Sequence, residues 1–332
     1  MCTVTNLSAD DHYFGRNLDV ESSNNETVVI TPQNYQFKFR QVENIDSHHA
    51  IIGMAVVVDN YPLYYDACNE KGLCIAGLNY YEAKYQDLNE NKDNITPYEF
   101  IPWILSQCEN VKEAVELIKN INIVNIDFSE DITLTPLHWM ISDNDESIVV
   151  EPNENDIIIY PNPTGVLTNS PSFDKQLFNL NNYRHLSSKT PKNNFSSNLE
   201  LNVYTNGMGA IGLPGDSSSM SRFVRANFNL QNILVGHTEE ENVIQFFHVL
   251  DSVSQTKGCT EVSQGKYEYT LYSSCINANQ GIYYYKTYFN SQINAINMYN
   301  YDLTDDELAI YPLNDYPEIN YQNSKKEEYM FN

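Results

Sequence analysis

The chain opens with MCTVTNLSADDHYFGRNLDV (residues 1–20), in which a short polar turn separates two alternating stretches. Residues 2–7 and 12–20 alternate between apolar and polar side chains, as strands with one buried face do. Residues 8–11 read Ser-Ala-Asp-Asp and are typical of a turn. We therefore predict a β-hairpin at the start of the chain, with Cys2 near the free end of its first strand.

Cys2 is the first candidate for a catalytic residue. Because its side chain is small, an aminopeptidase is expected to remove Met1 and leave Cys2 with a free α-amine. Such a residue combines a thiol nucleophile with an amine base whose pKa is near about 8. The alternative is an inert cysteine that occupies position 2 by accident, which is the common fate of a lone cysteine.

The hairpin register decides which side chains surround Cys2. A turn over residues 8–11 would place Cys2 opposite Asn17. In that register Asp19 would share the face of Cys2, and Arg16 would need a bulge to join them. A guanidinium favours a thiolate and a carboxylate can orient an ammonium, but a weak surface ion pair between Arg16 and a carboxylate is the simpler alternative.

The rest of the chain alternates between groups of strands and pairs of helices. A capping box at 96–99 predicts a helix to about residue 108, and Asn110 and Thr238 are predicted N-caps of two further helices. This order predicts an α+β fold with two antiparallel sheets packed together and helices outside. We find no repeat or linker, so we predict one domain over 2–332, with polar residues 187–220 forming a long excursion.

Composition excludes several classes of protein. Nineteen basic and 44 acidic side chains give a formal net charge of −25, which disfavours binding to nucleic acid or anionic membranes. No apolar run approaches the roughly 20 residues of a membrane helix, and the start lacks a secretory signal. Six cysteines in 332 residues are too few for a disulfide scaffold, so we expect a cytoplasmic protein. No metal or cofactor motif is found.

Three further polar residues follow strands or loops where they could act in catalysis. Asn79 and Asn169 each follow an apolar stretch, and an asparagine amide at such a place can donate to an oxyanion. Arg222 begins a predicted helix after a Gly/Pro loop. Taken singly, the asparagines are more typical of turns and Arg222 of a solvated helix start.

Taken in order, several motifs resemble the choloylglycine hydrolase family, in particular its members from gut lactobacilli and enterococci. The resemblance spans essentially the whole chain, and it rests on the motifs MCT (1–3), YFGRNLD (13–19), NEKGL (69–73), AGLN (76–79), GVLTNSP (165–171), GLPGD (212–216), SRF (221–223), YEYTLYSS (267–274) and GIYYY (281–285).

The resemblance implies an N-terminal-nucleophile hydrolase with a four-layer αββα sandwich, no cofactor and no metal. It implies that Cys2 is the nucleophile, ordered by Arg16 and Asp19. Asn169 would be the side-chain oxyanion donor, with the backbone N–H of Asn79 as its companion. Arg222 would be a second catalytic arginine. It also implies a homotetramer in which residues 187–220 serve assembly.

The implied substrates are conjugated bile salts, steroid acids joined by an amide to glycine or taurine. Such a substrate needs an apolar groove, and apolar residues near the motifs are its candidate walls, each equally well explained as ordinary core: Leu18, Val20, Val58, Tyr61, Leu63, Ile132 and Leu134.

Other functions of the same fold stay open at this point. A penicillin V acylase would use the same nucleophile, although such relatives tend to carry tyrosine where this chain has Asn79. Another N-acyl amidase and an inactive binding or structural homologue are the further alternatives, the last disfavoured by the intact set of site residues. Cys74, often glycine in relatives, could crowd the site or form a disulfide with Cys2 on oxidation.

Overall fold

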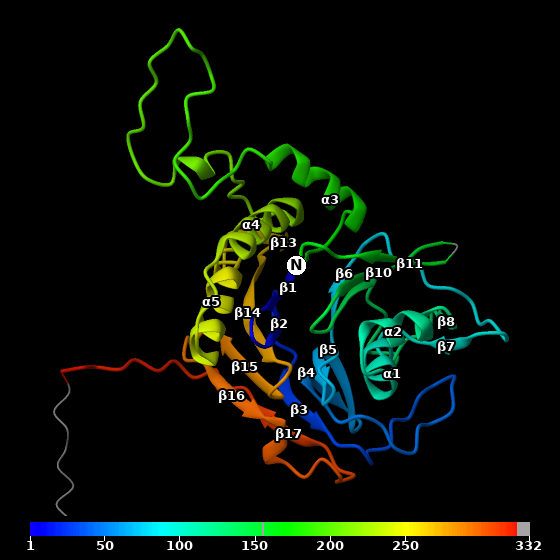
Figure 1. Cartoon of the computed structure of the whole chain (residues 1–332). Helices are drawn as coiled ribbons and strands as arrows, with labels where there is room; N and C mark the ends of the chain where they lie inside the picture. The colour runs from blue at the N-terminus through cyan, green and yellow to red at the C-terminus, as the bar shows by residue number, and fades with distance from the viewer. Residues whose placement is uncertain (155, 324–332) are drawn as a thin grey trace, which may run out of the picture.

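The computed structural model describes residues 1–154 and 156–323, in which two β-sheets stack between two layers of helices (Figure 1). The sheets face each other, and apolar side chains from both fill the space between them. A second apolar cluster lies between the outer face of one sheet and the helices that cover it. The predicted α+β architecture, an αββα sandwich, is therefore confirmed.

The sheet that carries Cys2 has β2 between the first strand and a strand from the end of the chain. Its order is β12-β1-β2-β14-β15-β16, and β13 pairs with β14. The strands are β1 (Cys2–Ser8), β2 (His12–Val20), β12 (Val166–Leu167), β13 (Thr260–Ser263), β14 (Lys266–Asn277), β15 (Ile282–Thr287) and β16 (Asn294–Asn297).

The facing sheet has eight strands in the order β11-β10-β9-β6-β5-β4-β3-β17. Its strands are β3 (Thr27–Thr31), β4 (Ile51–Val58), β5 (Tyr61–Asn69), β6 (Cys74–Asn79), β9 (Leu137–Ser142), β10 (Ser147–Pro152), β11 (Ile157–Pro161) and β17 (Ala309–Pro312), and a separate short parallel pair consists of β7 (Asp93–Ile95) and β8 (Ile121–Ile123).

Helices α4 (Ser219–Asn232) and α5 (Glu239–Asp251) lie over the sheet that carries Cys2, and α1 (Phe100–Gln107) and α2 (Val111–Ile118) lie over the facing sheet (Figure 1). α3 (Phe173–Leu180) follows β12. The polar excursion after α3 leaves the layered body as a long loop (Figure 1).

Local capping decides where the helices begin. The predicted caps are confirmed, because Asn110 accepts from the N–H of Glu113 at 3.1 Å and Thr238 accepts from that of Glu241 at 3.3 Å. The capping box predicted at 96–99 does not begin the first helix. The Glu99 carboxylate does bind the N–H and hydroxyl of Thr96, at 3.1 and 2.8 Å, but it closes a turn, and α1 begins only at Phe100.

The predicted hairpin forms, but its register differs from the prediction by one residue. Cys2 lies opposite Leu18, not Asn17, because the turn leaves only three unpaired residues between Ser8 and His12. Since a slip of one residue exchanges the faces of a strand, Arg16 shares the face of Cys2 between the two sheets. Asp19 is on the other face, toward the helices.

Burial of His12 predicts a specific loss of stability in acid. His12 lies at the start of β2 and is 1% exposed, and desolvation lowers its pKa from 6.5 to about 4, a shift that Asp143 opposes. The unfolded chain therefore takes up a proton below pH 6.5 that the folded chain refuses until about pH 4. Stability from the neutral ring is present above pH 6.5 and is lost as the pH falls toward 4.

We expect His12→Phe to remove this dependence. Urea unfolding at pH 7 and pH 5 should show that wild type loses about 2 kcal/mol more than the variant over this range. An equal loss in both proteins would contradict the assignment to His12.

Candidate active site

Cys2 is the first residue of β1 and is 5% exposed. Its backbone N–H donates to Oδ1 of Asn169 at 2.8 Å. Met1 is present, and its ammonium donates to the Asp19 carbonyl at 2.7 Å and to Oε1 of Glu268 at 2.6 Å. Glu268, a neighbour of the N-terminus that sequence reasoning missed, comes from β14.

Arg16 lies beside Cys2 and is fully buried between the sheets. Its Nη1 donates to the carbonyls of Tyr65 (2.9 Å) and Gly77 (2.7 Å), which belong to the facing sheet. Burial acts to lower the pKa of Arg16, but Cys2, with Tyr272 and Asp66, raises it above its usual value. A guanidinium held there favours negative charge on the Cys2 sulfur.

Asp66 interacts electrostatically with Arg16, and sequence reasoning also missed it. This buried carboxyl on β5 accepts from the hydroxyls of Tyr272 (2.6 Å), Tyr283 (2.7 Å) and Ser274 (3.0 Å). The Ser274 oxygen in turn accepts from the backbone N–H of Arg16 at 3.2 Å. Burial raises the pKa of Asp66, and Arg16 is the strongest opposing influence.

Asn169 and Arg222 meet Cys2 from two other parts of the chain. Arg222, from α4, donates through Nη1 to the Cys2 carbonyl and to the Thr3 hydroxyl, each at 2.6 Å, and through Nη2 to Oδ1 of Asn169 at 2.8 Å. The Asn169 amide nitrogen donates to the Asn79 carbonyl at 2.9 Å. Because an amide nitrogen carries two protons, the second stays available for a ligand.

Asp19 and Asn79 also lie at the site. Asp19 is buried, and Oδ1 accepts from the Thr270 hydroxyl at 2.7 Å, while its backbone carbonyl holds the Met1 ammonium. Burial raises the pKa of Asp19, against the influence of Arg222 and the N-terminus. The Asn79 carbonyl accepts from the Asn169 amide, which places Asn79 beside Asn169, and donation by its backbone N–H to an oxyanion stays a prediction.

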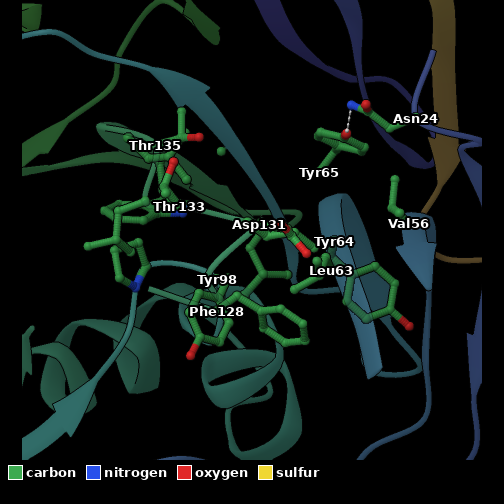
Figure 2. Close-up of a pocket in the computed structure, with 17 residues that line it drawn as sticks. Asn24, Val56, Leu63, Tyr64, Tyr65, Tyr98, Phe128, Asp131, Thr133 and Thr135 are labelled. Atoms are coloured by element: carbon green, nitrogen blue, oxygen red, sulfur yellow. Dashed lines mark hydrogen bonds between the residues drawn. The ribbon is translucent and has the colours of Figure 1, made fainter. Parts of the chain in front are cut away.

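A cavity of about 480 Å³ has Tyr64, Tyr65 and Phe128 in its wall (Figure 2). Tyr65 and Gly77, whose carbonyls hold Arg16, are part of its lining. The remaining wall is largely apolar and aromatic and includes three of the predicted groove residues, Leu63, Ile132 and Leu134, together with Tyr64, Tyr98, Ile101, Phe128 and Trp139. It is therefore suited to a rigid apolar ligand.

The other four predicted groove residues lie outside this lining. Leu18 is buried opposite Cys2, Val20 pairs with Tyr269, and Val58 pairs with Tyr61 at the β4–β5 turn. Tyr61 lines a neighbouring cavity instead. These four residues are close to the motifs in sequence, but they do not line the cavity.

Cys74 lies in the apolar cluster between the sheets that also contains Cys2. It lies opposite Cys68 across β5 and β6, fully buried, and burial raises the pKa of its thiol well above the usual value. Within residues 1–154 and 156–323 no group of three or more His, Cys, Asp or Glu side chains could hold a metal ion. In the same part of the chain, no helix combines the length and apolarity that crossing a bilayer demands.

A four-layer αββα sandwich whose first strand begins with a cysteine, beside buried arginines and an asparagine amide, defines the class of N-terminal-nucleophile hydrolases. The family described as "Linear amide C-N hydrolases, choloylglycine hydrolase family" matches residues 2–311. The chain therefore belongs to the choloylglycine hydrolase family.

Its relatives agree with this assignment. The chain is 55% identical to a bile salt hydrolase/transferase of Lactiplantibacillus plantarum over 314 residues, which are 94% of this chain and 97% of the relative. It is 39% identical to the bile salt hydrolase/transferase of Clostridium perfringens, over 97% of this chain and 100% of the relative.

Solved structures match the fold as well. The C2A mutant of conjugated bile acid hydrolase from Clostridium perfringens superposes with a TM-score of 0.90 at 38% identity, covering 97% of this chain and 100% of that one. A penicillin V acylase from Agrobacterium tumefaciens gives 0.74 at 21% identity, covering 93% and 90%, and shows the shared fold alone.

Proposed function

We propose that the chain hydrolyses the amide bond of glycine- and taurine-conjugated bile salts, with Cys2 as the nucleophile. The observation that carries this proposal is the convergence of Arg16, Asn169 and Arg222 on Cys2 beside an apolar cavity. High identity to relatives named bile salt hydrolases supports the choice of substrate.

The first half of the reaction transfers the acyl group to the enzyme. Once Met1 is removed, the Cys2 α-amine takes the thiol proton, and the thiolate attacks the amide carbon. The second N–H of the Asn169 amide donates to the resulting oxyanion. The α-ammonium then passes its proton to the leaving amine, the C–N bond breaks, and a thioester on Cys2 is left.

Water completes the cycle. The α-amine takes a proton from water, and the hydroxide equivalent adds to the thioester carbon. The C–S bond then breaks, the α-ammonium returns its proton to the sulfur, and the free acid and the Cys2 thiol are released. Arg16 stabilises negative charge on sulfur. Arg222 fixes the Cys2 carbonyl and Asn169 in one arrangement. The carboxyl of Asp19 orients the new α-ammonium from the helix side.

Recognition depends on the steroid, because the net charge of −25 repels an anionic ligand at long range. Burying apolar steroid surface in the cavity beside Arg16 contributes about 25 cal/mol per Å². The amino-acid end keeps its charge near solvent and contributes less. If the steroid provides most of the binding free energy, a change in the cavity wall should weaken the binding of both conjugates. The same assay distinguishes bile salts from other acyl groups.

Leu134→Asp is expected to raise KM for glycocholate and taurocholate together, by about tenfold, because it introduces a charge into the apolar wall. Wild type should hydrolyse both far faster than penicillin V. Leu88→Asp, on an exposed leucine outside this cavity, is the matched control and should change neither KM.

Moderate salt should lower KM or leave it unchanged, since screening weakens the repulsion. A strong rise in KM with salt would instead place the main contact at a positive site for the amino-acid end, with Arg222 as the first suspect. Faster turnover of penicillin V than of either bile salt would assign the chain to the acylase alternative, and no turnover of any substrate would indicate an inactive homologue.

We also propose that the protein is a single domain that works in the cytoplasm as a homotetramer. Support comes from the excursion after α3, where apolar side chains lie 50–83% exposed: Phe195, Leu199, Leu201, Val203 and Tyr204. Burial of these side chains against a second copy would remove a large apolar surface from water. Light scattering of the purified protein measures the number of subunits directly.

A further inference from the structure

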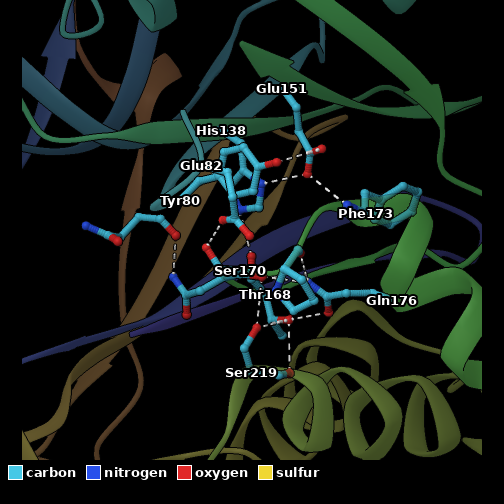
Figure 3. A network of polar contacts seen from close by, with 12 residues as sticks. Tyr80, Glu82, His138, Glu151, Thr168, Ser170, Phe173, Gln176 and Ser219 are labelled. Atoms are coloured by element: carbon cyan, nitrogen blue, oxygen red, sulfur yellow. Dashed lines mark hydrogen bonds and ion pairs between the residues drawn. The ribbon is translucent and has the colours of Figure 1, made fainter. Parts of the chain in front are cut away.

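His138 and Glu151 are a buried ionisable pair that the mechanism above does not use (Figure 3). His138, on β9, is fully buried, and Glu151, on β10, is 2% exposed. Nδ1 of His138 lies 3.1 Å from Oε1 of Glu151, and Nε2 lies 2.8 Å from the carbonyl of Thr168. The Tyr80 ring stacks on the imidazole, with centroids 4.6 Å apart and planes 2° from parallel.

The contacts of this pair require a proton between them. A carbonyl only accepts, so Nε2 of His138 must donate to Thr168. Nδ1 faces a carboxylate oxygen, and a hydrogen bond there needs a proton on either Nδ1 or Glu151. The pair therefore holds one proton in either case and is neutral as a whole, which explains how a buried carboxyl is accommodated here.

The pair forms hydrogen bonds to both ends of the segment that carries Asn169. His138 holds the carbonyl of Thr168, immediately before Asn169. Glu151 accepts from the N–H of Phe173, the first residue of α3, at 2.9 Å. Residues 169–172 lie between these two anchors, so a shift in either one displaces the Asn169 side chain.

Two other residues hold the Asn169 backbone without reaching the pair directly. Gln176 donates to the carbonyls of Asn169 and Pro171, and Ser219 donates to the carbonyl of Asn169 at 2.9 Å. The Thr168 hydroxyl donates to Gln176 at 2.7 Å, which joins these contacts to the residue that His138 holds. The network therefore fixes the backbone of Asn169, and its side chain is left to face Cys2.

We propose that His138 and Glu151 are positioning residues that hold the Asn169 amide at the place where the oxyanion forms. The proposal rests on the proposed function of Asn169 as the oxyanion donor. Because such a donor acts mainly in the transition state, a displaced amide should lower kcat and leave KM nearly unchanged.

Glu151→Gln tests the pair with little change in volume. Oε1 of Glu151 contacts both Nδ1 of His138 and the N–H of Phe173. In the variant, an amide oxygen at this place keeps the contact with Phe173 but offers neither a proton nor a charge to Nδ1, and an amide nitrogen donates to Nδ1 but cannot accept from Phe173, so one contact is lost. We expect kcat for glycocholate to fall about 10-fold to 100-fold, as for small misplacements of catalytic groups, with KM within about twofold. The rate at which iodoacetamide alkylates Cys2 should stay the same, because alkylation forms no oxyanion.

Two substitutions of His138 distinguish its hydrogen bond to Thr168 from its ring contact with Tyr80. His138→Gln can still place an N–H where Nε2 donates to Thr168, and it should retain more activity than His138→Phe, which keeps only a ring against Tyr80. His48→Gln is the matched control, since His48 is also buried with both ring nitrogens against backbone carbonyls, and it should leave kcat unchanged. Thermal unfolding of every variant verifies the fold.

A double-mutant cycle decides between positioning and general destabilisation. In the Asn169→Ala background, Glu151→Gln should cost less than about twofold in kcat, because no amide is left to position. Multiplicative losses, or slower alkylation of Cys2 in Glu151→Gln, would overturn the proposal. If Asn169→Ala alone leaves kcat intact, the oxyanion role of Asn169 fails, and the positioning proposal fails with it.

Discussion

Cys2→Ser is expected to lose nearly all turnover of glycocholate, by about 10⁴-fold in kcat, while the protein stays folded. A hydroxyl is far less ionised than a thiol at neutral pH, and the α-amine is too weak a base to compensate. The site around residue 2 is tight but lets an oxygen replace the sulfur, so the thermal midpoint should change little.

The control for this variant is Cys259→Ser, which alters an exposed thiol that makes none of the contacts described around Cys2 and should remain fully active. Intact mass of the active protein should show that Met1 is absent, because only a free α-amine on Cys2 can act as the base. Full activity in a protein that retains Met1 would contradict the mechanism, and so would substantial turnover by Cys2→Ser.

Asn169→Ala is expected to lower kcat by about 10²–10³ with little change in KM, as the loss of a single oxyanion donor does. The amide has one proton committed to Asn79 and one available for the oxyanion. Steady-state kinetics with glycocholate and taurocholate measure the effect. Asn181→Ala, at the end of the adjacent helix, is the control and should behave as wild type.

The opposite pattern in Asn169→Ala would change its assignment. A large rise in KM with kcat intact would make Asn169 a residue that positions the substrate before reaction. Because Oδ1 also accepts from the N–H of Cys2 and from Arg222, the thermal midpoint should be measured in parallel to separate lost catalysis from lost structure.

Local patterns in the sequence predict most of the fold. The alternation in 2–7 and 12–20 and the caps at Asn110 and Thr238 depend on neighbouring residues, and the structure contains the hairpin and both helices. The hairpin register does not follow from alternation alone. The turn closes with three residues, and this one-residue difference places Arg16, rather than Asp19, beside the Cys2 side chain.

The candidate site is likewise only partly predictable from the sequence. The motifs predict Cys2, Arg16, Asn169 and Arg222, and the structure brings these four together. Supporting groups are harder to predict, because Asp66, Glu151 and Glu268 are single carboxyls within apolar strands, and only the pairing of distant strands gives them partners. Their one signal in the sequence is an acidic residue in a run that otherwise predicts a buried strand, as in YYDAC (64–68) and IVVEP (148–152).

The wide spacing of the residues around Cys2 also sets the order in which the protein acquires its reactivity. Asn169 and Arg222 lie 167 and 220 residues along the chain from Cys2. Closing a loop of that length costs about 2 kcal/mol more than closing the hairpin to Leu18, so these contacts form late in folding. Until then Cys2 has Arg16 beside it in the hairpin, but it lacks the Asn169 amide and Arg222. The newly made chain therefore lacks its oxyanion donor, and it can hydrolyse an amide only when the cavity that selects its substrate is also complete.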